Sequence, residues 1–271
     1  MGTLYVVGTP IGNLEDITLR AVRVLREVRL IAAEDTRKAG VLLSHYEITT
    51  PVTSFFEANE RRKIDAILNA LERGDVALIS EAGMPGISDP GYPMIQAAIE
   101  RDVPVVPIPG PSAHTAALVV SGLPTDRFMF VGFLPRKQPE AAVEELAEIQ
   151  ATLIFYEAPH RLAQTLRTLR EVLGARPIAL CRELTKLYEE VWRGDLEAAL
   201  DWVKSNPPRG EFTLVVAGAS EQDVRWDEAR VRAALREHME RGLSRSQAAR
   251  EVAALSGWRR RRVYDLPVER S

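Results

Sequence analysis

The residues of this chain best suited to hold a ligand lie in one long loop, Ser80–Gly91. The loop contains glycines at 83, 86 and 91 and prolines at 85 and 90, which exclude a helix or a regular strand. An apolar run, Val76–Ile79, precedes it and a helical pattern follows Pro93. The loop therefore joins the carboxyl end of a strand to a helix, where open α/β sheets bind ligands. An ordinary connecting loop is the alternative.

Two further loops rich in glycine or proline follow apolar runs. Gly8–Asn13 comes after Thr3–Val7, and Pro109–Ala113 comes after Val105–Ile108. Convergence of three such loops predicts a pocket for a nucleoside-type cofactor, because glycine allows the backbone to approach the ligand. The first loop lacks the Gly-Lys-Ser/Thr of a Walker A sequence and the Gly-x-Gly-x-x-Gly of dinucleotide-binding proteins. The sequence therefore disfavours an NTPase.

A polar cluster, Glu34–Arg37, directly follows the apolar run Leu30–Ala33. Asp35 or Thr36 could cap the next helix. The same side chains could also contact a substrate, since they lie at the carboxyl end of a strand. The two interpretations are compatible, and the residues alone favour neither.

Strand-loop-helix units repeat through the first part of the chain and indicate a mostly parallel sheet. Further strand patterns at 128–133, 152–156, 178–181 and 212–216, with helices predicted over 140–150 and 196–203, form a second half. We therefore predict an α/β protein. Its expected parts are an amino-terminal α/β domain with the cofactor loops (1–122), a second α/β domain (123–222) and a basic helical module (223–271).

Composition narrows the class of protein. A single cysteine, Cys181, excludes an internal disulfide and fits a reducing compartment. No signal peptide or membrane-length apolar run is present, so a cytoplasmic protein is expected. The four histidines are scattered and no metal-binding motif appears, so no metal site is expected.

Charge is unevenly distributed along the chain. The net charge is −3, yet the stretch from Arg225 to Arg270 holds twelve arginines against seven acids. Three short helices are expected there, the second capped by Ser244 and the third starting at Trp258 with four consecutive arginines. This arrangement resembles a helix-turn-helix module and favours an anionic partner such as nucleic acid. A solvated helical cap is the alternative.

Several motifs, taken in order, resemble the 16S ribosomal RNA (cytidine-2′-O)-methyltransferase family of the tetrapyrrole methylase-like superfamily. They are Leu4–Leu14, Glu34–Arg37, Ser80–Gly91, Pro109–Ala113, Phe155–Arg161 and Arg182–Lys186. Where the wider superfamily has Gly-Asp-Pro, this chain has Gly83-Met84-Pro85. Its first loop also departs from the usual Gly-x-Gly-Pro-Gly. Both departures point away from tetrapyrrole substrates.

The resemblance implies a class III methyltransferase with two α/β domains, S-adenosyl-L-methionine in the cleft between them, and a homodimer. The implied partner is 16S ribosomal RNA, within the small ribosomal subunit. The implied cofactor residues are Pro10, Ile11, Gly12, Gly83, Met84, Pro85, Ile87, Ser112, Ala113 and Tyr156.

Methyl transfer to a ribose hydroxyl requires removal of its proton. Carboxylates and a lysine are the catalytic candidates: Asp35, Glu157, Glu183 and Lys186. Arginines could hold RNA phosphates, and the candidates are Arg37, Arg161, Arg182, Arg259, Arg260, Arg261 and Arg262. For each catalytic candidate, an ion pair or helix cap at a strand end is the structural alternative.

Two other functions are compatible with these residues. The same cofactor pocket could serve methylation of a tetrapyrrole or another small molecule. The chain could also be a nucleic-acid-binding module without enzymatic activity. Binding of S-adenosylmethionine would separate an enzyme from such a module.

Overall fold

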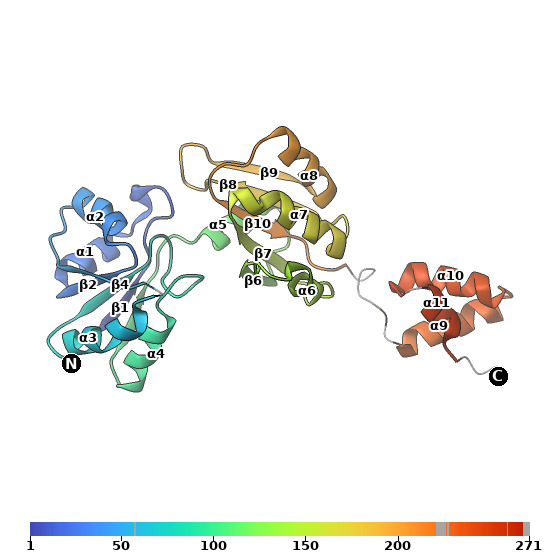
Figure 1. The fold of residues 1–271 in the computed structure, drawn as a ribbon, viewed down its shortest axis with the longest axis horizontal. Helices are drawn as coiled ribbons and strands as arrows, with labels where there is room; N and C mark the ends of the chain where they lie inside the picture. The colour runs from blue at the N-terminus through green and yellow to red at the C-terminus, as the bar shows by residue number, and fades with distance from the viewer. Residues whose placement is uncertain (57, 221–225, 227, 259, 268–271) are drawn as a thin grey trace. The chain divides into compact units, whose positions relative to one another are not determined.

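The computed structural model describes residues 1–271 except 57, 221–225, 227, 259 and 268–271 (Figure 1). It divides into two compact units. The first comprises Met1–Val120, Cys181–Val191 and Gly210–Thr213, and the second comprises Ser121–Leu180, Trp192–Arg209 and Leu214–Ser271. The main boundary lies close to the expected one. However, two short segments from late in the chain belong with the first unit, so neither unit is contiguous.

The first unit is built on a parallel sheet in the order β3-β2-β4-β1-β5. Its strands are β1 (Leu4–Val7), β2 (Leu30–Ala33), β3 (Val52–Ser54), β4 (Val76–Ile79) and β5 (Val105–Ile108). Val7 pairs with Ile108, and Ala33 pairs with Ile79. The strands therefore end together, and the loops that follow them emerge along one edge of the sheet.

Successive strand residues belong alternately to two separate apolar cores, one on each face of the sheet. Ile31, Ala33 and Ile79 face the core shared with α1 (Leu19–Glu27) and α2 (Thr36–His45). Ala32 and Leu78 face the core shared with α3 (Glu60–Leu71) and α4 (Tyr92–Glu100). Figure 1 shows these two helix pairs on opposite faces. Burial on both faces explains why β4 is a continuous apolar run.

The remaining elements of this unit are short. The 3₁₀ helix η1 (Leu14–Asp16) follows the first loop, and α5 (Ala113–Ser121) follows β5. Within the part of the chain that the structure describes, no helix is both long and apolar enough to span a membrane.

A second five-stranded sheet has the order β6-β7-β10-β8-β9. Its strands are β6 (Phe128–Phe133), β7 (Thr152–Glu157), β8 (Pro177–Arg182), β9 (Glu190–Asp195) and β10 (Phe212–Val216). Helices α6 (Pro139–Glu144), α7 (Pro159–Leu173) and α8 (Leu196–Ser205) accompany it, with α7 packed against the other two.

In this region the sequence analysis missed one strand and predicted one helix too long. We did not predict β9, because it is an edge strand whose residues are charged or only half-buried, without a buried alternating face. The helix expected over 140–150 ends at Glu144. Beyond it, Leu146, Ala147 and Ile149 donate hydrogen bonds three residues back, to Val143, Glu144 and Leu146. The α-helical bonding therefore gives way to tighter turns.

The carboxy-terminal helices are α9 (Glu228–Glu240), α10 (Arg245–Ser256) and α11 (Arg260–Asp265). Ser244 caps α10 through a capping box with Gln247, which confirms the expected cap. The third helix starts later than expected, because Trp258 is buried in the core of these helices and donates its indole N–H to the carbonyl of Trp226 at 2.6 Å. The described side chains of this core come from the three helices and from residues next to them in the chain.

Gly8 and Gly110 bring the loops after β1 and β5 into direct contact. A Cβ on Gly8 would lie 2.8 Å from Cα of Gly110 and 2.7 Å from Sδ of Met84. A Cβ on Gly110 would in turn lie 2.8 Å from the carbonyl of Gly8. Neither position has room for a side chain.

We expect Gly8→Ala to lower the free energy of unfolding by roughly 1–3 kcal/mol, because the added methyl group overpacks a backbone contact. Gly40→Ala is the matched control. Gly40 lies within α2 with no atom near its missing Cβ, so alanine there should stabilise the protein by about 0.5–1 kcal/mol. Chemical denaturation of both variants checks this. Equal stability of Gly8→Ala and wild type would contradict the packing argument.

Candidate functional site

The three glycine and proline loops of the first unit meet at its strand ends. The N–H of Thr9 donates to the carbonyl of Gly83 at 2.9 Å, and the N–H of Gly83 donates back at 3.0 Å. The hydroxyl of Thr9 also lies 3.4 Å from the carbonyl of Ser80. Together with the Gly8–Gly110 approach, these contacts confirm the expected convergence of the loops. The result is a surface made largely of backbone, which is suited to close contact with a ligand.

The residues expected to bind a cofactor differ in their placement. All of them except Tyr156 belong to the first unit. Ile11, Gly83 and Pro85 are buried, whereas Ile87 is exposed. Tyr156 lies at the end of β7 in the second unit, where its ring contacts Phe130 and Phe133 edge-on. The loop contacts thus bring together the residues around Gly12, Gly83 and Ser112, but not Tyr156.

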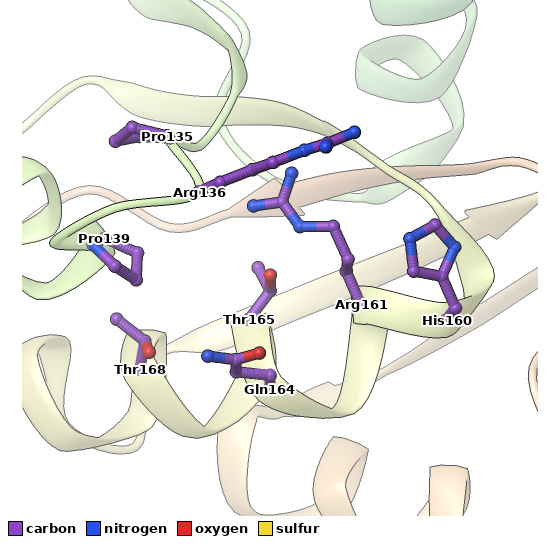
Figure 2. A pocket seen from close by; sticks show the side chains of 8 residues that line it. All are labelled: Pro135, Arg136, Pro139, His160, Arg161, Gln164, Thr165 and Thr168. Atoms are coloured by element: carbon purple, nitrogen blue, oxygen red, sulfur yellow. The ribbon is translucent and has the colours of Figure 1, made fainter.

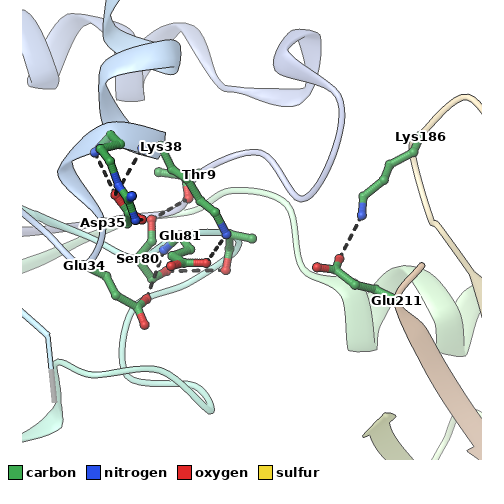
Figure 3. Close-up of polar contacts among 10 residues, drawn as sticks. Thr9, Glu34, Asp35, Lys38, Ser80, Glu81, Lys186 and Glu211 are labelled. Atoms are coloured by element: carbon green, nitrogen blue, oxygen red, sulfur yellow. Dashed lines mark hydrogen bonds and ion pairs between the residues drawn. The ribbon is translucent and has the colours of Figure 1, made fainter. Parts of the chain in front are cut away.

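Glu183 and Lys186 form a charged network beside the first loop. The ammonium of Lys186 lies 2.9 Å from a carboxylate oxygen of Glu183. It also lies 2.9 Å from a carboxylate oxygen of Glu211, and Figure 3 shows this second pair. Glu183 also accepts a hydrogen bond from the N–H of Glu211 at 2.9 Å. A Cβ on Gly12 would overlap the stem of Lys186. Gly12 is therefore the position that lets Lys186 pack on this loop.

The backbone around Lys186 is held in unusual conformations. Glu183 and Thr185 have positive φ angles, 49° and 68°, which cost energy for residues with a side chain. The hydroxyl oxygen of Thr185 is buried with no hydrogen-bond partner among the described residues. Strain and an unsatisfied polar atom next to a cofactor-type loop are features typical of a functional segment.

The charges in this network are well defined at neutral pH. Burial by itself would lower the pKa of Lys186, but its hydrogen bonds to Glu183 and Glu211 outweigh burial and raise that pKa above the usual value. Burial would likewise raise the pKa of Glu183, but the Lys186 ammonium and the Glu211 N–H together lower it. Lys186 is therefore a cation and a hydrogen-bond donor at this site, and it is not a general base.

Asp35 caps α2. Its carboxylate accepts hydrogen bonds from the N–H groups of Arg37 and Lys38, and the Arg37 guanidinium lies 3.0 Å from it. The side chain of Arg37, followed by these backbone bonds, lowers the pKa of Asp35 to about 2. A carboxylate of such low basicity is poorly suited to remove a proton at neutral pH. The structure thus shows the cap, and contact with a substrate remains a prediction.

Glu157 is enclosed in the second unit at the end of β7. The hydroxyl of Thr165 and the N–H of Ala158 both donate to its carboxylate, and Arg161 lies 3.6 Å away. The side chain is completely buried. These contacts match the structural alternative of an ion pair at a strand end.

One acidic residue that we did not predict stands out in the central loop. Burial, reinforced by the charge of Glu34, raises the pKa of Asp89 to about 7. Burial also raises the pKa of Glu34, whose carboxylate accepts the N–H of Glu81 at 3.1 Å (Figure 3). Glu81 in turn pairs with Lys38. A group with a pKa near neutrality can take up a proton at physiological pH. The sequence feature that could have pointed to this residue is a single aspartate among the glycines and prolines of Ser80–Gly91.

The arginines expected to bind RNA are dispersed. Arg37 is paired with Asp35, and Arg182 lies 3.3 Å from Glu190. Arg161 lines a cavity in the second unit. In the carboxy-terminal helices, Arg260 donates to Ser246, Arg261 is exposed and Arg262 stacks on Trp258. Arg259 lies outside the described residues.

The described side chains contain no group of three or more histidines, cysteines and acids arranged to hold a metal ion.

Asp89 should make stability depend on pH. The folded protein retains this proton up to about pH 7, whereas an unfolded chain releases it near pH 4. The stabilisation is therefore fully present below about pH 4 and is lost as the pH rises to 7. The stability of Asp89→Asn relative to wild type should increase over that range and then level off. Urea denaturation at several pH values measures it, with exposed Asp102→Asn controlling for the substitution itself. A pH-independent difference would refute the assignment.

Comparison with known proteins agrees with this architecture. The family model described as Tetrapyrrole (Corrin/Porphyrin) Methylases matches residues 3–200, and the model described as RsmI C-terminal HTH domain matches residues 226–270. Uroporphyrin-III-C-methyltransferase from Thermus thermophilus is similar in structure, with a TM-score of 0.59 and 24% identity, over 80% of this chain and 94% of that chain. Diphthine synthase is similar with a TM-score of 0.63 and 16% identity, over 80% of this chain and 90% of that chain. These likenesses show the fold alone.

Closer relatives carry one name, Ribosomal RNA small subunit methyltransferase I. The protein from Synechocystis is 48% identical over 99% of this chain and 98% of its own length. The protein from Halalkalibacterium halodurans is 45% identical, over 98% of this chain and 94% of its own length. The protein from Thermotoga maritima is 47% identical, over 80% of this chain and 99% of its own length. The chain therefore belongs to the tetrapyrrole methylase family and, within it, to the ribosomal RNA small subunit methyltransferase I family.

Proposed function

We propose that this protein uses S-adenosylmethionine to methylate the 2′-hydroxyl of a cytidine in small-subunit ribosomal RNA. The observation that carries the proposal is the 48% identity, over 99% of the chain, with a protein named Ribosomal RNA small subunit methyltransferase I. The choice of cytidine as the target nucleotide, and of its 2′-oxygen as the target atom, rests on the motif resemblance. The proposed place of action is the cytoplasm, with the ribosomal RNA.

The loops of the first unit fit such a cofactor. A Cβ on Gly83 would meet only Ile11 and the carbonyl of Pro111, each at 3.7 Å. The backbone is therefore open at Gly83, whereas it is closed by contact at Gly8 and Gly110. A related structure, at 20% identity, is described as complexed with S-adenyl homocysteine. When bound, S-adenosylmethionine supplies an electrophilic methyl group on a sulfonium.

The chain's own residues would position the ribose and handle its proton. Lys186 is a fixed cation beside the first loop, so it can hold the ribose oxygen and stabilise negative charge that develops there. Glu183 holds the Lys186 ammonium in place. Asp89 is the group with a pKa suited to accept the hydroxyl proton near pH 7. The proposal assigns positioning to Glu183 and proton transfer to Asp89.

Two further parts of the proposal concern assembly. Phe128, Met129 and Phe133 on β6 are 48%, 43% and 53% exposed in the single chain, and large exposed apolar side chains support a homodimer. The carboxy-terminal helices carry the positive excess and support RNA binding. The alignment with the Thermotoga maritima relative leaves about a fifth of this chain unmatched. This supports an accessory role for the unmatched part.

The decisive test incubates the purified protein with S-adenosylmethionine and small ribosomal subunits from a strain that lacks its own version of the enzyme. Mass spectrometry of the digested RNA should then show 2′-O-methylcytidine. Free porphyrin is the competing substrate in a parallel reaction. Methylation of porphyrin but not of ribosomal RNA would overturn the proposal.

We expect Glu183→Gln and Lys186→Met each to lower turnover at least tenfold, which corresponds to about 1.4 kcal/mol of barrier. Glu183→Gln removes the negative charge that holds the Lys186 ammonium, and Lys186→Met removes the ammonium itself. Affinity for S-adenosylmethionine, measured by calorimetry, should stay near that of wild type. Lys204→Met is the matched control, since Lys204 pairs with exposed Asp201 on α8. Normal turnover of both site variants would contradict the roles proposed for Glu183 and Lys186.

Truncation after Gln222 should leave a folded protein that still binds S-adenosylmethionine, because the converging loops and their strands precede the cut. RNA affinity should fall, and its dependence on salt should weaken, since fewer phosphates would be neutralised. RNA titrations at two salt concentrations, with thermal melting and sedimentation, provide the measurement. Unchanged RNA affinity with a lower melting temperature would instead identify the carboxy-terminal helices as a structural cap.

A further inference from the structure

A cavity of about 320 Å³ lies within the second unit, between the segment after β6 and the first turns of α7 (Figure 2). Pro135, Arg136 and Pro139 line it from the first segment. His160, Arg161 and Gln164 line it from the helix. Two guanidinium groups from different elements therefore reach into one space. The volume is within the range of small-ligand sites.

The two arginines differ in how they are held. Arg161 donates to the carbonyl of Leu134 at 2.9 Å and lies 3.6 Å from the buried carboxylate of Glu157. These contacts fix its guanidinium at the wall of the cavity. Arg136 is exposed, and none of the acidic side chains that the structure describes forms an ion pair with it. Figure 2 shows its extended side chain directed along the cavity, next to Arg161.

The two threonine hydroxyls that line the cavity do not neutralise this charge. The hydroxyls of Thr165 and Thr168 donate to Glu157 and Glu140, so both are already engaged. The amino end of α7 adds the positive end of a fifteen-residue helix that has no side-chain cap. The cavity therefore combines one fixed guanidinium, one uncompensated guanidinium and a helix amino end, an arrangement that attracts an anion.

Phosphodiester is the anion that this arrangement fits best. Guanidinium groups bind phosphate oxygens through paired N–H donors, and a phosphodiester can accept from two arginines at once. S-adenosylmethionine carries no phosphate, and the converging loops proposed to hold it belong to the first unit. We infer that the Arg136–Arg161 cavity binds a backbone phosphate of the substrate RNA. This inference rests on the proposed function, since it assigns the RNA of that function to a particular surface.

The test compares full-length Arg136→Ala with Lys137→Ala, using a fragment of small-subunit ribosomal RNA as the probe. Lys137 is the exposed neighbour of Arg136 and does not line the cavity, so each variant loses one positive charge from the same segment. Arg136→Ala should bind RNA about three- to tenfold more weakly, and the slope of log affinity against log salt should fall by about 0.7–0.9. Lys137→Ala should show a distinctly smaller change in both quantities.

A third variant separates charge from geometry. Arg136→Lys keeps the charge but loses the forked donor pair, so it should retain the salt slope while recovering only part of the affinity. In methylation assays, Arg136→Ala should raise KM for RNA more than it lowers kcat. Thermal melting of each variant verifies folding.

Equal RNA affinity and equal salt slope for Arg136→Ala and Lys137→Ala would overturn the inference, even if ribosomal RNA is methylated. Conversely, a specific loss in Arg136→Ala without any methylation of ribosomal RNA would support the cavity and reject the proposed function.

Discussion

The close approach of backbone at Gly8, Gly83 and Gly110 is the constraint on which the site depends. Three strands of a parallel sheet end side by side, and each sends out a loop. The loops after β1 and β5 would collide if Gly8 or Gly110 carried a side chain, and the loop after β4 is joined to the first loop by the backbone hydrogen bonds between Thr9 and Gly83. The apolar cores on both faces of the sheet fix the positions of the strand ends. The loops begin at those strand ends, so the packing of the two apolar cores fixes the geometry of the site.

The charged network around Lys186 is better explained by position than by stability. The three residues of this network are connected by hydrogen bonds of 2.9 Å, yet Glu211 is largely exposed and Lys186 is only partly buried. Ion pairs in such surroundings contribute little to stability. The positive φ angles of Glu183 and Thr185 also oppose folding locally. The network requires strained backbone and adds little stability, so we attribute its presence to selection for the placement of the Lys186 ammonium.

The sequence predicted the features that depend on local patterns. The strand-loop-helix repeats, the three loops and the Ser244 cap each follow from residues close together in the chain, and the structure confirms them. The edge strand β9 was missed because its charged residues carry no buried alternating pattern. Asp89 was missed because its pKa depends on burial and on Glu34, which lies more than fifty residues away in sequence. The site assignments for the cofactor, the base and the RNA remain proposals, since no pattern in the chain reports contact with a ligand.

The discontinuous make-up of the first unit affects how the chain folds during synthesis. Its continuous part ends at Val120, but Cys181–Val191 and Gly210–Thr213 complete it. At about 5–20 residues per second, the ribosome needs roughly 3–12 s to make the stretch between Val120 and Cys181. A nascent chain can thus form its first sheet and its glycine loops well before the segment that carries Lys186 is available. The glycine loops and the charged network are therefore assembled in separate stages, and the network is completed only when most of the protein has been translated.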